Sequence, residues 1–365
     1  MQASLRPATS NRMLVIDSET VLLKKRVPLT ITRGTRAESR LLWVRVCSEG
    51  IEGWGEAGEF SVGPLRQDLA ELETQAQRVA SMLAKEDPFD RAAMEHVMLR
   101  AQVPSALRAA VDQALWDWSG KRLGQPVWRL LGLSSSGAVP TSVTIGICAP
   151  EVAQQRVHEW QLAGEVQAFK VKLGSPLGLE ADRAMFQAIR SLLPDGFHIS
   201  VDANGGWDPA QAIEMSRWLA DRGVDHLEQP LARGREKEMV EVCGKSALPI
   251  LLDESCFTSA DIPDLAEICH GINIKLYKCG GVSEALRMIA VARAHDLKVM
   301  LGCYGNSALG NTAAAHLGTL VDYLDLDSHL NLVDDPFQGA SWIGGHLQLS
   351  SLPGFGVSHE HVPTH

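Results

Sequence analysis

The segment AFKVKL (residues 168–173) is the first of several short β-rich stretches that end in charged residues. It is followed by HISVDAN (198–204), HLEQP (226–230), ILLDES (250–255) and INIKLY (272–277). Their charged residues lie roughly 22 to 30 positions apart, which is the length of one strand, one helix and two loops. This spacing predicts repeated β–α units with parallel strands.

The same pattern extends in both directions along the chain. TSVTIGI (141–147) precedes these stretches, while VMLGCY (299–304) and DYLDLD (322–327) follow them. Helix-like segments such as AQAIEMSRWLADRG (210–223) separate the strands. We therefore expect an α/β fold, a (β/α)7–8 TIM-type barrel. An open doubly wound sheet is the alternative, but no predicted strand is followed by a Gly-x-Gly-x-x-Gly or P-loop sequence.

The N-terminal part of the chain follows a different pattern. Residues 40–60 contain an alternating stretch, a turn and GWGEAGEF, which predict a hairpin. Residues 65–99 and 106–131 have apolar residues at helical spacing. These features predict an α+β capping domain, and the Ser/Gly/Pro-rich stretch before Pro140 marks its end. The predicted division is residues 1–135 for the capping domain, 136–333 for the barrel, and 334–365, with the alternating run HLQLSS, for a return to the capping domain.

Composition narrows the class of protein. The chain of 365 residues has a net charge of -10, which argues against nucleic acid as a partner. No stretch has the roughly 18 uninterrupted apolar residues of a membrane helix, and the N-terminus lacks a signal-peptide pattern. The seven cysteines are scattered and form no Cys-x-x-Cys, which predicts free thiols. We expect no membrane partner and a cytoplasmic location.

Charged residues near the strand ends form the candidate site, because the C-terminal ends of barrel strands face the active site. The set comprises three lysines and three acids: Lys170, Lys172, Lys275, Asp202, Glu228 and Asp253. Three carboxylates at one mouth repel one another, and a hard divalent cation such as Mg²⁺ resolves that repulsion. The simpler alternative is that the acids form salt bridges with the lysines at the strand ends.

Two of the lysines lie in stretches on opposite sides of the predicted ring. Lys172 follows the second strand and Lys275 the sixth, so a metal-bound carboxylate between them can lose its α-proton to one lysine and regain it from the other. Lys170 and Mg²⁺ are expected to lower the pKa of the base, and the metal to stabilise the enediolate. Lys278 is treated as a surface residue and kept out of the site.

These sequences resemble those of the enolase superfamily, muconate lactonizing enzyme subgroup. The resemblance rests on FKVKLG, VDANGGW, LEQP, LLDES and INIKLYKCGG, and extends over nearly the whole chain, including GWGEA and LPGFGV. It implies Lys172 and Lys275 as acid/base catalysts, Lys170 as a supporting lysine, and Asp202, Glu228 and Asp253 as Mg²⁺ ligands. VMLGCYGNSALG contains no histidine, which disfavours the mandelate racemase subgroup.

The last predicted strand narrows the function within that subgroup. Asp325 and Asp327 share one strand face and resemble the Asp-x-Asp with which dipeptide epimerases bind the substrate's ammonium group. The resemblance implies a Mg²⁺-dependent isomerase that inverts the α-carbon of the C-terminal residue of an L-Ala-L-Glu type dipeptide. An N-acylamino acid racemase, an o-succinylbenzoate synthase and a non-catalytic dipeptide-binding protein are the alternatives. Family members are often homo-oligomers.

Four further residues are candidates for contacting the substrate. Thr144 lies on the first barrel strand, and Tyr304 stands in CYGNS, where many dipeptide epimerases carry a Met-x-Glu-Ser type sequence. Arg33 and Arg36 lie in TRGTRAES, which we expect to be a mobile loop that contacts an acidic substrate side chain. Exposed arginines with no substrate role, and a threonine that serves only packing, are the alternatives.

Overall fold

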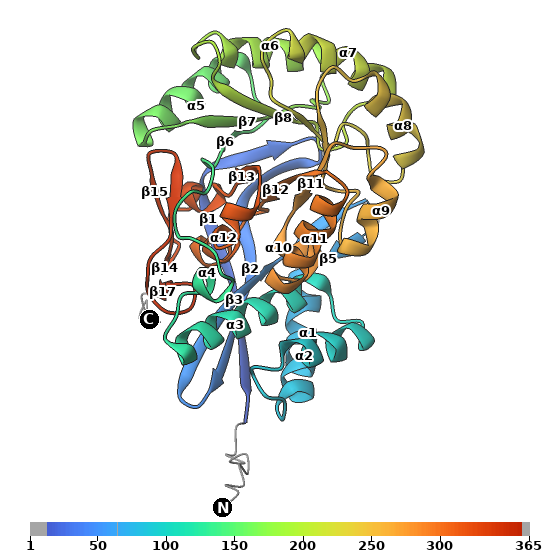
Figure 1. Cartoon of the computed structure of the whole chain (residues 1–365). Coiled ribbons are helices and arrows are strands. Elements are labelled where there is room, and N and C mark those ends of the chain that lie inside the picture. The colour runs from blue at the N-terminus through green and yellow to red at the C-terminus, as the bar shows by residue number, and fades with distance from the viewer. Residues whose placement is uncertain (1–12, 64, 360–365) are drawn as a thin grey trace, which may run out of the picture.

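Three antiparallel strands form the sheet of the capping domain in the computed structural model, which describes residues 13–63 and 65–359 (Figure 1). They are β1 (Val15–Ile31), β2 (Gly34–Ser48) and β3 (Ile51–Gly58). The β2–β3 pair is the hairpin predicted from residues 40–60. Strand β1 was not predicted, because polar residues interrupt its alternation and few of its side chains are buried. The expectation of a loop at TRGTRAES was wrong: Arg33 lies in the tight β1–β2 turn and Arg36 in β2.

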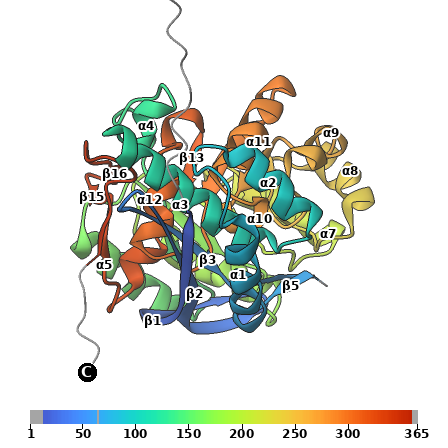
Figure 2. The same ribbon diagram turned by 90° about the horizontal axis from the view of Figure 1, so that it is seen from below.

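Helices cover one side of this sheet, as Figure 2 shows from the capping side. The helices of this domain are α1 (Leu69–Leu83), α2 (Arg91–Arg100), α3 (Ser105–Leu123) and α4 (Val127–Leu130). The short strands β4 (Phe60–Val62) and β5 (Leu65–Gln67) lie between β3 and α1 in the chain. Helix α3 packs directly on β3 at two glycines. A Cβ added at Gly55 would lie 2.0 Å from the Ala110 carbonyl oxygen, and one at Gly53 would lie 2.1 Å from that of Ala114. Hence GWGEA needs its glycines for close helix–sheet packing.

Eight parallel strands form the barrel, one for each of the eight predicted stretches. They are β6 (Val143–Ile145), β7 (Ala168–Lys172), β8 (His198–Asp202), β9 (Leu227–Glu228), β10 (Ile250–Leu252), β11 (Gly271–Ile274), β12 (Lys298–Gly302) and β13 (Tyr323–Asp325). Neighbours in sequence are neighbours in the sheet, and the Ser142 amide donates to the Leu324 carbonyl oxygen at 2.9 Å, which links the last strand to the first. The predicted TIM-type barrel is confirmed.

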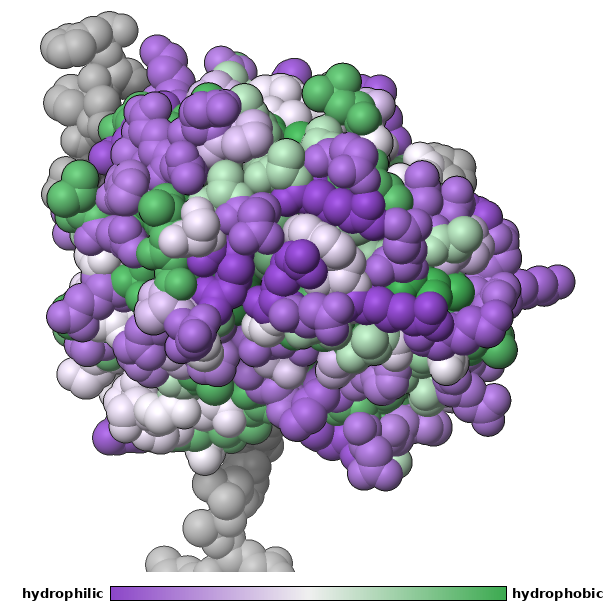
Figure 3. All heavy atoms as spheres, turned by 90° about the horizontal axis from the view of Figure 1, so that it is seen from above, coloured by the Kyte–Doolittle hydropathy of each residue, from purple (hydrophilic) through white to green (hydrophobic). Residues whose placement is uncertain are grey.

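Helices follow the barrel strands and form the outer ring (Figure 1). They are α5 (Pro150–Ala163), α6 (Leu179–Arg190), α7 (Pro209–Ala220), α8 (Glu236–Lys245), α9 (Ile262–Leu265), α10 (Leu276–Cys279), α11 (Val282–Ala294) and α12 (Ala308–Ala315). Their apolar faces and the strands share one buried core. Figure 3 shows that the face turned upward in Figure 1 is mainly hydrophilic. None of the helices in the described ranges is long and apolar enough to cross a membrane.

The C-terminal tail contacts both domains. Strand β14 (Phe337–Gln338) pairs with β17 (Ser358–His359), and the Phe337 ring lies 4.9 Å from the Trp43 ring of the capping domain. Strand β16 (His346–Gln348), from HLQLSS, pairs with β15 (Ser341–Ile343) instead of a capping strand. The Gly345 carbonyl oxygen next to it accepts from the Thr141 amide of the barrel at 2.9 Å.

A buried glutamate joins the capping sheet to the barrel. Glu56 of β3 accepts hydrogen bonds from the Tyr277 hydroxyl, from the Ser307 amide and hydroxyl, and from Trp43 Nε1 at 3.0 Å. Tyr277 follows barrel strand β11, and Ser307 precedes α12. Burial raises the pKa of Glu56 to about 7, while these hydrogen bonds oppose the rise.

We expect Glu56 to make stability depend on pH. Its pKa rises from 4.5 to about 7 on folding, so its contribution to stability is full below pH 4.5 and is lost as pH increases to about 7. The loss is about 3 kcal/mol of unfolding free energy. Urea unfolding between pH 4.5 and 8 should show this decline in the wild type and a flatter profile in Glu56→Gln. Glu52→Gln, an exposed change on the same strand, is the control; a wild-type slope in both variants would contradict the prediction.

Candidate active site

Strand β7 places two lysines at the C-terminal mouth of the barrel. Lys170 and Lys172 are two positions apart, so both side chains lie on the same strand face, and both are buried. Lys170 Nζ lies 2.7 Å from Asp325 Oδ2, 2.6 Å from Glu228 Oε2 and 3.6 Å from Asp202 Oδ2. Although burial opposes the charge, these carboxylates raise the pKa of Lys170 well above its usual value. Lys170 is therefore held as a cation.

The two candidate acid/base lysines each contact a different carboxylate. Lys172 Nζ donates to Asp202 Oδ2 at 2.6 Å, and Lys275 Nζ, at the end of β11, donates to Asp253 Oδ2 at 2.7 Å. Burial opposes the charge of Lys275, but Asp253 raises its pKa. Its nearest charged neighbour is an anion, which favours the ammonium form, whereas Lys170 opposes it.

The three candidate metal ligands lie at the ends of β8, β9 and β10, as predicted. Lys172 and Lys170 lower the pKa of Asp202 to about 2 despite its burial, whereas burial and the nearby Asp202 raise that of Glu228 to about 7. The described residues contain no group of three or more His, Cys, Asp and Glu side chains in metal-binding geometry. The lysines lie against the carboxylates, which is the salt-bridge arrangement that the sequence left open.

Oxygen atoms at this mouth nevertheless fit a hard divalent cation. In the part of the chain that the structure describes, Glu254 Oε2 and Asn204 Oδ1 are buried and accept no hydrogen bond. Buried oxygens without donors are costly, and carboxylate and amide oxygens are the ligands that Mg²⁺ uses. The donor set fits Mg²⁺ if the lysine ammonium groups move away from Asp202 and Asp253.

Lys278 is buried, so its treatment as a surface residue was wrong. It lies on the one-turn helix α10, and its Nζ donates to Asp253 Oδ1 at 2.6 Å, to the Asn273 carbonyl oxygen at 2.9 Å and to the Asp253 carbonyl oxygen. Lys278 therefore fixes the carboxylate that Lys275 also contacts. The signal in the sequence was that Lys278 is flanked by the hydrophobic residues Leu276, Tyr277 and Cys279, which are also buried.

Asp325 and Asp327 have different surroundings, although both are buried. Asp325 accepts from Lys170, and the Ser142 hydroxyl donates to its Oδ1 at 3.0 Å. Asp327 Oδ2 accepts from the Thr144 amide at 2.6 Å, and burial and Asp325 raise its pKa to about 6. Among the described residues Asp327 forms no ion pair, so it is the carboxylate of the two that retains capacity for an ammonium group.

Tyr304 follows β12 and lies beside Lys275. Lys275 Nζ is 4.5 Å from the centre of the Tyr304 ring, and that ring stacks on Phe60 of the capping domain at 5.2 Å. The buried Tyr304 hydroxyl has no hydrogen-bond partner in the described ranges. An aromatic wall therefore covers the Lys275 side of the mouth.

The two candidate arginines are both engaged by carboxylates. Arg33 Nη1 lies 2.8 Å from Glu254 Oε1 and 3.2 Å from the Asn204 carbonyl oxygen. Arg36 Nη1 lies 2.7 Å from Glu59 Oε1, and its side chain is 62% exposed. Arg33 thus closes over the mouth, whereas Arg36 lies outside it.

Comparison with known families agrees with this geometry. Residues 15–132 match the family model described as mandelate racemase / muconate lactonizing enzyme, N-terminal domain. Residues 151–361 match the model described as enolase C-terminal domain-like. The chain belongs to the enolase superfamily. The resemblance inferred from the strand-end residues is therefore confirmed at the level of the family.

Several relatives of this superfamily member are dipeptide epimerases. A hydrophobic dipeptide epimerase from Flavobacteria bacterium (strain MS024-2A) is 42% identical over 345 residues, which is 92% of this chain and 96% of that protein. An L-Ala-D/L-Glu epimerase from Bacteroides thetaiotaomicron is 34% identical, over 92% of this chain and 85% of that protein. The solved dipeptide epimerase of Enterococcus faecalis V583, complexed with Mg and L-Leu-L-Tyr, has a TM-score of 0.88 and 30% identity, covering 95% and 100% of the two chains.

Removal of the Lys278 ammonium should destabilise the folded chain. Lys278→Met leaves two carbonyl oxygens without this donor and the buried Asp253 with one cation fewer, at a cost of about 3–5 kcal/mol. Lys298→Met, which breaks an exposed pair with Asp322, should cost less than about 1 kcal/mol. Chemical unfolding of both variants checks this, and equal small losses would show that Lys278 has no structural role.

Proposed function

We propose that this chain is a Mg²⁺-dependent dipeptide epimerase that inverts the α-carbon of the dipeptide's C-terminal residue. The observation that carries the proposal is the placement of Lys172 and Lys275. They lie at the ends of β7 and β11, which are four strands apart in the eight-stranded ring, and both side chains reach one mouth. The 42% identity to a hydrophobic dipeptide epimerase supports the same reaction.

Two bases on opposite sides explain inversion. One lysine, as a free amine, takes the α-proton from one face of the substrate, and the other, as an ammonium, donates a proton to the opposite face. A single base would return the proton to the face it left. Each lysine already contacts a carboxylate, Asp202 or Asp253, which holds it at the mouth.

The remaining residues bind the substrate's ends. Asp202, Glu228 and Asp253 would hold Mg²⁺, which supplies positive charge for the substrate carboxylate. Asp327 receives the ammonium group, and Asp325 is neutralised by Lys170. The Thr144 amide orients Asp327 through its 2.6 Å hydrogen bond.

The C-terminal side chain of the substrate is apolar in this proposal. Arg33 and Arg36, the residues expected to contact an acidic side chain, already hold Glu254 and Glu59. The wall beside Lys275 is aromatic instead, formed by Tyr304 stacked on Phe60. An apolar residue such as leucine fits this wall better than glutamate.

We also propose that the enzyme acts in the cytoplasm. All seven cysteines are free, although four of them are partly exposed, and this pattern is typical of a reducing compartment.

Loss of either lysine should abolish inversion. Lys172→Ala and Lys275→Ala should each lower kcat for epimerisation of L,L-dipeptides by at least about 10³-fold, because one face loses its proton donor or acceptor. The measurement is incubation with Mg²⁺ and a mixed L,L-dipeptide library in D₂O, with mass spectrometry to detect deuterium at the α-carbon.

The exposed change Lys298→Ala is the control and should behave like the wild type. Wild-type epimerisation by both active-site variants would rule out the two-base mechanism. Failure of the wild type to introduce deuterium into any dipeptide would favour the acyl-substrate racemase or synthase.

Asp327 should matter for dipeptides with a free N-terminus. Asp327→Asn keeps the shape of the side chain but removes its charge, so kcat/KM should fall about 30-fold or more. N-acetylated dipeptides lack the ammonium, and the same substitution should change their slow turnover much less. Asp322→Asn, one residue before β13, serves as the control, and equal losses on both substrates would contradict an ammonium site.

A further inference from the structure

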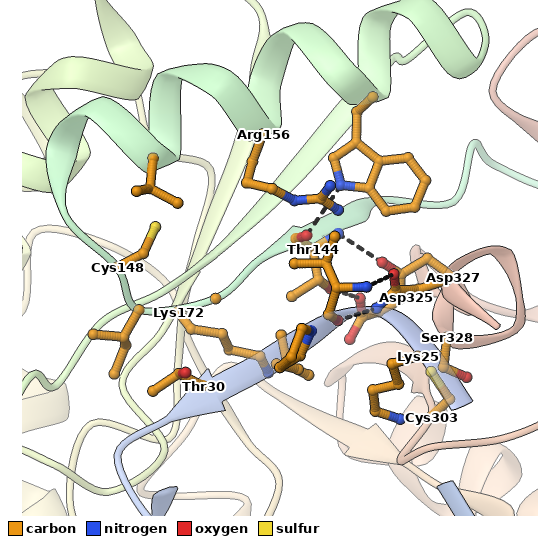
Figure 4. Close-up of a pocket in the computed structure, with 18 of the residues that line it drawn as sticks. Lys25, Thr30, Thr144, Cys148, Arg156, Lys172, Cys303, Asp325, Asp327 and Ser328 are labelled. Atoms are coloured by element: carbon orange, nitrogen blue, oxygen red, sulfur yellow. Dashed lines mark hydrogen bonds between the residues drawn. The ribbon is translucent and has the colours of Figure 1, made fainter. Parts of the chain in front are cut away.

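A cavity of about 150 Å³ lies between the capping domain and the barrel mouth (Figure 4). Residues of β1, among them Lys25 and Leu29, form one wall. Thr144, Lys172 and Asp327, at the ends of barrel strands, form the other. The cavity therefore opens onto the catalytic lysine at one point and onto the proposed ammonium site at another.

Most charged groups that line this cavity already have a partner of opposite charge. Arg156 pairs with Glu159 outside the cavity. Lys172 pairs with Asp202, and Asp325 with Lys170, at 2.6 and 2.7 Å. These three lining groups are neutralised without a ligand.

The two other charged groups that line the cavity are Lys25 and Asp327, and their charges are opposite. Asp327 accepts one backbone hydrogen bond from Thr144, and Lys25 Nζ donates one hydrogen bond, at 2.6 Å, to the neutral Ser39 hydroxyl. Neither forms an ion pair with any residue in 13–63 or 65–359. An ammonium group has three donors, so two of those of Lys25 remain for a ligand.

The surroundings of Lys25 make an anionic partner favourable. Figure 4 shows Lys25 beside Cys303 and Ser328, on the same side of the cavity as Asp327. Burial lowers the pKa of Lys25, although Cys303 and Asp327 oppose this shift, so keeping a cation at this place is costly. A carboxylate placed beside Lys25 offsets that cost.

We infer that the cavity selects dipeptides whose N-terminal residue is acidic, with Lys25 binding the side-chain carboxylate and Asp327 the α-ammonium. The inference rests on the proposed function and names its N-terminal substrate class. An N-terminal glutamate carries both charges on one residue, and its methylene groups match the apolar Val27 and Leu29 of the β1 wall. The C-terminal residue keeps its apolar side chain.

The test compares two substrates of nearly the same shape, L-Glu-L-Leu and L-Gln-L-Leu. The wild type should have a kcat/KM at least about tenfold higher for the glutamate substrate, and Lys25→Met should lower that ratio to near one. Lys24→Met, an exposed change on the neighbouring residue, should keep the wild-type ratio. A wild-type ratio of one or below, or an unchanged ratio in Lys25→Met, would overturn the inference.

Further measurements separate this inference from the proposed function. If the protein epimerises no dipeptide, the proposed function fails. Calorimetry with Mg²⁺ can then still compare the binding of L-Glu-L-Leu and L-Gln-L-Leu, and so test whether Lys25 binds the glutamate carboxylate. Preferential binding of L-Glu-L-Leu by the wild type, lost in Lys25→Met, would support the subsite without turnover, whereas equal binding would overturn it. If Lys25→Met does not fold, the wild-type glutamate-to-glutamine ratio decides alone. An equal loss on both substrates in Lys25→Met would mean that Lys25 contacts the peptide carbonyl, which also overturns the inference.

Discussion

The alternation of buried positive and negative charge at the C-terminal ends of the barrel strands is the constraint on which the site depends. Lys170 has no exposed surface and lies against three carboxylates from three other strands. A buried cation is tolerated only with such compensation, and each carboxylate needs the cation in turn. The strand ends are thereby held in one arrangement, and Lys172 and Lys275 are held at the mouth by Asp202 and Asp253.

The capping domain is bound to this mouth by polar contacts rather than by apolar packing alone. Glu56 joins β3 to the segments after β11 and β12, and these segments carry Lys275 and Tyr304. Arg33, in the β1–β2 turn, reaches across to Glu254. Both contacts fix capping residues against residues that follow barrel strands. The substrate cavity lies between the two domains and is lined by Lys25 of the capping domain, so its shape depends on these contacts.

The barrel and much of the candidate site could be predicted because strand periodicity and charged strand ends are local signals. Each of the eight stretches became a strand, and Lys172, Asp202 and Lys275 meet at one mouth. Contacts between domains leave no such signal: Lys25 lies in β1, far in sequence from Asp327, and its exposed neighbours hid the strand. Lys278 was missed because a lysine near a helix turn suggests solvent, whereas its partners are the Asp253 carboxylate and two carbonyl oxygens. The pairing of Arg33 and Arg36 with glutamates was equally invisible in the sequence.

The unequal surroundings of Asp325 and Asp327 bear on how such a site diverges in evolution. Replacing Asp325 removes a counter-charge from the fully buried Lys170 and so damages the folded barrel as well as the site. Replacing Asp327 removes a carboxylate that accepts a hydrogen bond from the Thr144 amide and forms no ion pair within residues 13–63 and 65–359. Position 327 is therefore free to vary, and a descendant that accepts substrates without an ammonium group can arise through that position while the rest of the charge network stays intact.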